Sequence, residues 1–256
     1  MKKTLLCMVA ALVVVTAGAW AQGRKPPQAK SKKEVEAILA VQSAQDPDGR
    51  IKAAEALLRG FADTQFKEFA LQMETLSYQE KNDFENMVVT GERTLEVNPE
   101  NVVILVALAQ ALPQRTREHD LDREEKLTKA EGYAKKAQGL IPNEEKPNPQ
   151  ITDEQWTDFK KGTMSQAHEA IGMVAFARKN YDAAEAAFKQ GAEIAPQPDA
   201  MILYRLGTTY AAANKFDEAI AAFDKSVAAG GVKAGGRDLA ADGKAAAHKA
   251  KAAGGK

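Results

Sequence analysis

Histidine and cysteine are the side chains most often used for metal binding and for nucleophilic or acid–base catalysis. In this chain of 256 residues, His119, His168 and His248 stand far apart, and Cys7 lies near the start within an apolar run. No histidine has a second one three or four residues away, the spacing that places two ligands on one face of a helix. His119 lies in a charged stretch as a solvated side chain, and His168 beside Glu169 is better explained by a surface position on a repeat helix than by proton transfer. These residues predict no metal site and no cofactor.

The sequence also lacks the motifs that mark common enzyme classes. It contains no G-x-S-x-G nucleophile turn and no glycine loop of the kind that binds phosphate. Lys and Arg number 35, as do Asp and Glu, so no excess of positive charge favours nucleic acid. We therefore expect a non-catalytic chain whose function lies in a surface that binds another protein or a peptide.

The first 33 residues have the composition of an export signal followed by a linker. Lys2 and Lys3 precede an apolar run, and Ala19-Trp20-Ala21 ends it, which predicts a signal peptide over residues 1–21 cleaved after Ala21. The mature chain would then be cysteine-free and would reside in the periplasm or cell envelope. An uncleaved membrane anchor is the alternative. Residues 22–33 are basic and contain two prolines, which predicts a solvated linker.

A pattern repeats in the second half of the chain with an offset of 35 residues. It covers residues 168–196 and then 203–231, so that Gly172 aligns with Gly207 and Phe188 with Phe223. Two antiparallel helices cross closely where one of them carries glycine, and the large ring on the other helix fills the adjacent space. The pattern therefore predicts the same helical hairpin twice.

The period, the glycine, the Lys-Asn or Asn-Lys turn and the later aromatic-Asp-x-Ala and Phe resemble the tetratricopeptide repeat. The resemblance implies an all-α fold, a right-handed α-solenoid of helical hairpins, without cofactors. Earlier parts of the chain match less well, since Thr75 and Gly91 replace the preferred glycine and large apolar residue. About five hairpins are expected, followed by a tail at 232–256 that is either a weak capping helix or disordered. The expected hairpins span 31–63, 64–99, 100–142, 150–196 and 197–231.

Local signals place some helix boundaries. Ser31 with Glu34, and Thr152 with Gln155, match capping boxes that start helices. The third hairpin is nine residues longer than the usual 34, and we interpret the charged stretch at 114–125 as an exposed extension of its turn.

The resemblance also implies a concave groove lined by the first helix of each hairpin. Each lining residue can alternatively pack against the neighbouring repeat. The mixed, mostly uncharged lining suits a segment of another protein, and a small-ligand carrier is the alternative function. The sequence lacks the Asn and Lys or Arg set with which some tetratricopeptide domains clamp a chain terminus. The candidate groove residues are Gln72, Leu76, Gln79, Ile104, Leu108, Ala111, Glu169, Met173, Phe176, Tyr204, Thr208 and Ala211.

Overall fold

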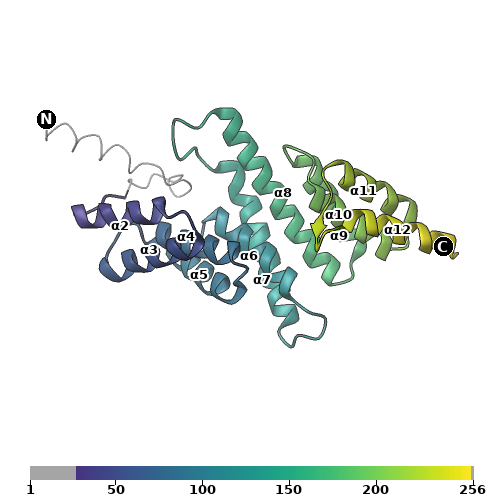
Figure 1. Cartoon of the computed structure of the whole chain (residues 1–256), viewed down its shortest axis with the longest axis horizontal. Coiled ribbons are helices and arrows are strands. Elements are labelled where there is room, and N and C mark those ends of the chain that lie inside the picture. The colour runs from purple at the N-terminus through teal and green to yellow at the C-terminus, as the bar shows by residue number, and fades with distance from the viewer. Residues whose placement is uncertain (1–26, 255–256) are drawn as a thin grey trace. The chain divides into compact units, whose positions relative to one another are not determined.

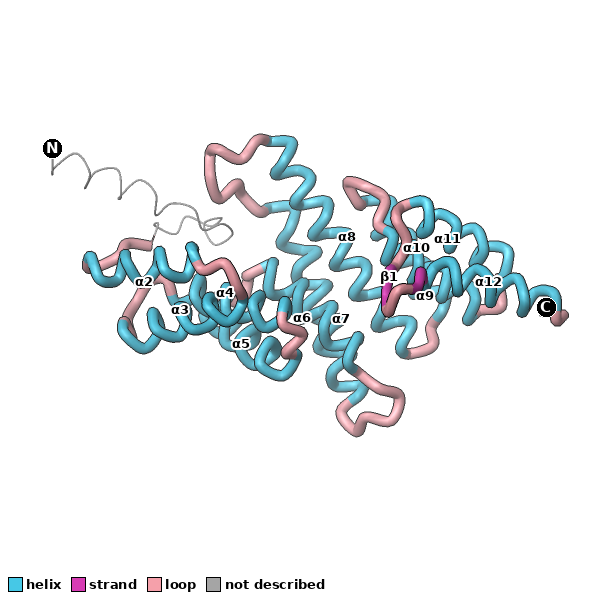
Figure 2. The backbone as a smooth tube through the Cα atoms, in the orientation of Figure 1, coloured by secondary structure: helices cyan, strands magenta, loops and turns pink. Residues whose placement is uncertain are grey.

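The computed structural model describes residues 27–254, which form an almost entirely helical chain (Figure 1). Short loops join most of the helices, and two short strands form a small antiparallel hairpin near the end (Figure 2). The expected signal peptide lies outside the described residues. The helices are α2 (Lys32–Ser43), α3 (Pro47–Gly60), α4 (Lys67–Glu80), α5 (Phe84–Val97), α6 (Val102–Arg115), α7 (Arg123–Leu140), α8 (Asp153–Ala177), α9 (Tyr181–Ile194), α10 (Ala200–Ala212), α11 (Phe216–Ala228) and α12 (Leu239–Ala252), with the short 3₁₀ helix η2 (Ile141–Asn143) and strands β1 (Lys233–Ala234) and β2 (Arg237–Asp238).

The chain divides into two compact units. Among the described residues, the first contains 27–108 together with 142–156, and the second contains 109–141 together with 157–254. Within each unit, helices that follow one another in sequence pack against one another. This consecutive pairing is the arrangement of an α-solenoid, so the predicted fold class is confirmed.

In the first unit, the two predicted capping boxes form different sets of hydrogen bonds. At α8 the bonds are reciprocal: Gln155 N donates to Thr152 Oγ1 at 3.1 Å, and Thr152 N donates to Gln155 Oε1 at 3.0 Å. At α2, Ser31 Oγ accepts from Glu34 N at 3.1 Å. The Glu34 carboxylate instead accepts from Lys30 N at 2.6 Å and from the Thr64 hydroxyl at 2.7 Å. Glu34 therefore ties the start of α2 to the loop before α4.

The expected solvated linker is partly wrong. Within the described part, Lys30 Nζ donates to the Asp63 carbonyl at 3.1 Å, and Ala29 packs against the apolar cluster of α2 and α3. Helix α2 already begins at Lys32. The last residues of the range 22–33 therefore belong to the folded first unit.

The α4–α5 pair shows what replaces the glycine crossing in the poorly matching repeat. Thr75 is fully buried, and its hydroxyl donates to the Leu71 carbonyl at 2.8 Å and lies 3.1 Å from Thr90 Oγ1. The hydroxyl is thereby satisfied inside the pair. Gly91 instead allows close packing of α5 against Leu108 of α6, because a Cβ at position 91 would lie only 2.9 Å from Leu108 Cδ2.

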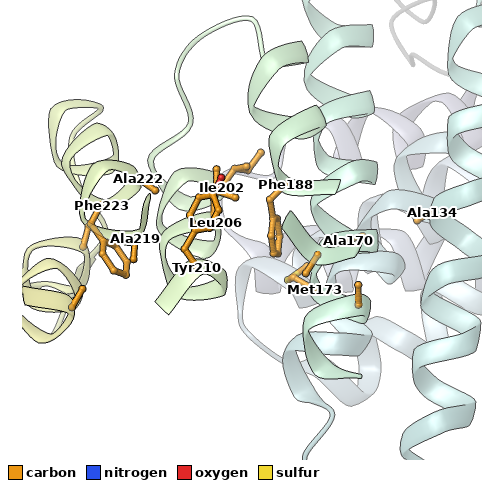
Figure 3. Packing of buried hydrophobic residues seen from close by; sticks show 14 of the residues in the cluster. Ala134, Ala170, Met173, Phe188, Ile202, Leu206, Tyr210, Ala219, Ala222 and Phe223 are labelled. Atoms are coloured by element: carbon orange, nitrogen blue, oxygen red, sulfur yellow. The ribbon is translucent and has the colours of Figure 1, made fainter. Parts of the chain in front are cut away.

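In the second unit, the glycine and phenylalanine of each repeat meet directly. A Cβ on Gly172 would lie 2.6 Å from Phe188, and one on Gly207 would lie 2.7 Å from Phe223. Both rings are buried in one apolar cluster together with aliphatic side chains such as Ile202 and Leu206 and several alanines (Figure 3). The predicted close crossing is therefore present in both copies.

The turns inside the hairpins also repeat. Asn82, Lys179 and Asn214 each adopt a positive φ of 56–60° between the two helices of a pair. In each case the next residue's N–H bonds at 2.9 Å to a carbonyl five residues earlier, as Asn180 does to Ala175, which closes the first helix. Lysine is a poor fit to this conformation, whereas asparagine tolerates it.

The end of the described chain forms a helix, one of the two structures that the sequence left open. Asp238 caps α12 through its Oδ1, which accepts from Ala240 N at 3.0 Å. Gly243 in α12 lies against Phe223, so the ring is packed between two glycine-bearing helices. No helix among residues 27–254 is both long enough and apolar enough to cross a membrane.

Candidate functional site

The second unit contains a pocket of about 400 Å³. It lies among the end of α6 and the loop after it, the end of α8 with its turn, the start of α9, and α10. The lining residues are Pro113, Gln114, Thr116, Glu118, Arg123, Met173, Phe176, Ala177, Lys179, Tyr181, Phe188, Tyr204, Arg205 and Thr208.

Two turns build the polar side of the pocket. In the α6–α7 loop, Arg117 N donates to Asp120 Oδ2 at 3.0 Å, which fixes the loop's own conformation. Glu118 from this loop accepts from Lys179 Nζ at 2.7 Å, and this bond holds the pKa of Glu118 below its usual value. Arg123 donates to the Ala177 carbonyl at the end of α8. Lys179, whose positive φ belongs to the turn that closes α8, is thereby held at the pocket that it lines.

A buried carboxylate orients the third cationic side chain of the lining. Glu169 on α8 accepts from Arg205 Nε on α10 at 2.7 Å through Oε1, and from Gln110 Nε2 on α6 at 2.6 Å through Oε2. Both oxygens accept hydrogen bonds, the pattern expected of the ionised group. Burial raises the pKa of Glu169 above its usual value, although the charge of Arg205 opposes the rise. Glu169 therefore joins three helices and fixes the Arg205 guanidinium at its Nε edge.

This buried group predicts a specific pH dependence of stability. The folded chain binds the proton of Glu169 more tightly than the unfolded chain does. The stabilisation that results from this proton is therefore complete below the pKa of Glu169 in the unfolded chain, and it is lost as the pH rises through the higher pKa in the folded chain. The free energy of unfolding of the parent minus that of Glu169→Gln should therefore decrease from pH 4.5 upward and then level off. Urea unfolding at a series of pH values measures this difference. A difference that increased with pH would show that Arg205 and Gln110 outweigh the burial.

The structure brings four of the predicted groove residues together. Met173, Phe176, Tyr204 and Thr208 all line the pocket, and Glu169 supports it from behind. Ala211 packs instead against the apolar cluster.

Some of the other predicted groove positions belong to the core. Ile104 and Leu108 are fully buried, so they pack inside the fold and do not face a groove. Because α6 is an almost continuous apolar run, its sequence offered no means of separating a buried face from a groove face. Met173 lines the pocket but is only 6% exposed, so truncating it would also remove core packing.

The remaining predicted positions lie outside the pocket lining. Gln72 is half-buried and accepts from Asn101 Nδ2 at 2.8 Å, which ties it into the first unit. Leu76 and Ala111 are half-buried, and Gln79 is exposed.

The stretch 114–125 is mostly exposed and forms the connection between α6 and α7, as expected, but the sequence offered no sign that it contributes to a pocket. Gln114, Thr116, Glu118 and Arg123 line the same pocket as the groove residues of α8 and α10. Arg205 was not among the predicted groove residues, although it lies beside Tyr204 on a helix expected to face the groove. Its positive charge next to a predicted groove residue was the signal available in the sequence.

The histidines take no part in this site. His119 is exposed in the loop after α6, and burial lowers the pKa of half-buried His168. Among residues 27–254, no three His, Cys, Asp or Glu side chains are grouped as metal ligands would be.

Comparisons with known proteins agree with this architecture. The family profile described as tetratricopeptide repeat matches residues 163–230, which contain the two copies of the hairpin. Among curated proteins, none matches the sequence. Residues 163–230 are therefore similar to tetratricopeptide repeats. Such repeats stack into extended concave surfaces that bind other proteins.

Three solved structures share the fold. The chain is similar to TTC0263, a thermophilic tetratricopeptide-repeat protein of Thermus thermophilus, with 18% identity, a TM-score of 0.53, and coverage of 80% of this chain and 91% of the other. It is also similar to PilW, a type IV pilus biogenesis factor, with 17% identity, a TM-score of 0.57, and coverage of 86% and 90%. The MamA RS-1 ArsTM double mutant gives 11% identity, a TM-score of 0.57, and coverage of 78% and 96%. At these identities the likeness concerns the fold alone.

Proposed function

We propose that this chain is a non-catalytic scaffold that binds a segment of another protein in the pocket of its second unit. The observation that carries the proposal is the convergence of four groove residues, Met173, Phe176, Tyr204 and Thr208, on a pocket of about 400 Å³. The pocket combines aromatic and Met surface with charged groups at its edge. This combination of apolar anchors and polar groups suits a peptide whose side chains enter the pocket.

Filling the pocket should block binding without unfolding the chain. Thr208 lines the pocket and is only half-buried, so Thr208→Trp places a large side chain there at little cost to the core. We expect capture of the partner to decrease at least about tenfold while the melting temperature stays nearly unchanged. Gln190→Trp, at an exposed position of α9 outside the pocket lining, is the matched control and should bind normally. Equal capture by both variants would place the binding site elsewhere.

A small-ligand carrier is a second candidate, favoured by the volume of the pocket. Pockets that bind small molecules commonly span roughly 300–1,000 Å³ and carry a few well-placed polar groups. Native mass spectrometry of the purified chain distinguishes the two functions. A tightly retained small molecule that Thr208→Trp abolishes would favour the carrier.

We further propose that the chain is exported and acts in the cell envelope. The proposal rests on the sequence of residues 1–21, and the fold shared with a pilus biogenesis factor is compatible with it. N-terminal sequencing of the protein expressed in a bacterial host should begin at Gln22. Recovery of the chain with an intact Met1 in the membrane fraction would instead show that residues 1–21 are retained as a membrane anchor.

A further inference from the structure

We infer that the pocket selects its partner by an acidic side chain, which binds the two terminal nitrogens of Arg205. The inference rests on the proposed function and specifies the chemistry of the partner. It commits to an Asp or Glu inside a peptide segment, next to an apolar residue.

Arg205 differs from Arg123 and Lys179, the other cations of the lining, because both terminal nitrogens of its guanidinium group are available to bind a partner. Its Nε is bound to Glu169 at 2.7 Å, which fixes the plane of the group. No described residue accepts a hydrogen bond from Nη1 or Nη2, and the side chain keeps 23% of its exposure. Lys179 is bound to Glu118, and Arg123 to the Ala177 carbonyl. Arg205 therefore presents a pre-oriented pair of nitrogen donors to the pocket it lines.

Two parallel N–H donors match the two oxygens of a carboxylate, and such bidentate pairs are among the stronger hydrogen bonds in proteins. The pocket lining carries three cationic side chains and one anionic side chain, in a chain whose formal net charge is zero. Counting the buried Glu169 behind Arg205 still leaves an excess of one positive charge. The local charge is thus complementary to a single carboxylate.

Other anionic groups fit less well. A phosphate with nearly two negative charges would lie in the same pocket as the Glu118 carboxylate, whose own partner Lys179 is already used. A chain terminus needs further donors to fix it, and besides Arg205 the lining contains no asparagine and no cation with two free terminal nitrogens. An internal acidic side chain requires only the Arg205 fork, while Phe176 and Tyr204 offer apolar contact to its neighbour.

Two matched peptide libraries test this chemistry directly. Both contain N-acetylated, C-amidated nonapeptides with neighbours drawn from Leu, Met, Phe and Ser, and the central residue is Glu in one and Gln in the other. The parent protein should retain the Glu library at least about tenfold better. Arg205→Gln should abolish this preference, and Arg205→Lys should restore only part of it because an ammonium group has no fork. Lys225→Gln, the same change of charge at an exposed position of α11, should keep the full preference.

The outcomes separate the two proposals. Equal retention of both libraries, still blocked by Thr208→Trp, would overturn the acidic preference and leave peptide binding in the pocket intact. Retention that Thr208→Trp does not reduce would overturn both. Full restoration by Arg205→Lys would overturn the role of the two-nitrogen geometry. A third library with central Gln and a free C-terminal carboxylate, if retained as well as the Glu library, would overturn the choice of an internal side chain.

Discussion

Truncation of Phe223 to alanine should lower the free energy of unfolding by about 3–5 kcal/mol. The ring is 2% exposed and lies against the positions of two glycines, Gly207 on α10 and Gly243 on α12. Because these helices carry no side chain at the contact, they fill little of the cavity that the ring leaves, and the neighbouring Tyr204 ring, whose centroid lies 5.8 Å away, can relax toward it only in part. We therefore expect a cost within the range given for large core residues. Urea unfolding followed by circular dichroism measures it.

Val227→Ala is the control for this prediction. Val227 lies one turn further along α11 and is 40% exposed, so its truncation should change the free energy by no more than about 0.5 kcal/mol. Similar costs for the two variants would show that α10 and α12 do not close on Phe223 as the structure indicates.

Substitution of Gly207 by leucine should destabilise the chain by about 1–3 kcal/mol. The Cβ alone would approach Phe223 Cδ1 to 2.7 Å, and the ring has no free space into which it can move. Leucine gains up to about 1 kcal/mol of helix propensity over glycine, which the strain must exceed. Thermal and urea unfolding of the variant give the net effect.

Gly132 on α7 provides the matched control, since a Cβ there would meet nothing within 4 Å. Gly132→Leu should stabilise the chain by up to about 1 kcal/mol through propensity alone. The double variant Gly207→Leu, Phe223→Ala should cost less than the sum of its single changes, because the leucine occupies part of the vacated space. Strict additivity would mean that the two residues do not touch.

The sequence predicted the contacts between glycine and phenylalanine because these two residues have few alternative roles when they repeat at the same spacing in both copies of the hairpin. Gly172 and Phe188 repeat with Gly207 and Phe223, and the structure places each pair in contact. The same reasoning failed at Thr75, where a hydroxyl bonded inside the helix pair replaces the glycine crossing. A polar residue gives no sign in sequence that its hydrogen bonds can be satisfied in the core.

The pocket was predictable only in part. Helical periodicity placed Phe176, Tyr204 and Thr208 on the exposed faces of their helices, and the structure brings the three together in the pocket lining. The wall formed by the α6–α7 loop was not predictable, since it depends on the long-range bond between Glu118 and Lys179. Likewise, nothing local pairs Arg205 with Glu169, which is 36 residues away. Contacts between distant charged residues are set by the packing of the repeats.

Site-specific photo-crosslinking tests the central claim, that partners bind in the pocket of the second unit. A photoreactive phenylalanine analogue replaces Phe176, a half-buried ring of the pocket lining that it resembles in size, and separately Val227, which is exposed on α11 outside the lining. On irradiation in cells, the analogue at Phe176 should yield a protein adduct that Arg205→Gln weakens, while the analogue at Val227 yields none. An adduct formed from Val227 and not from Phe176 would contradict binding in the pocket.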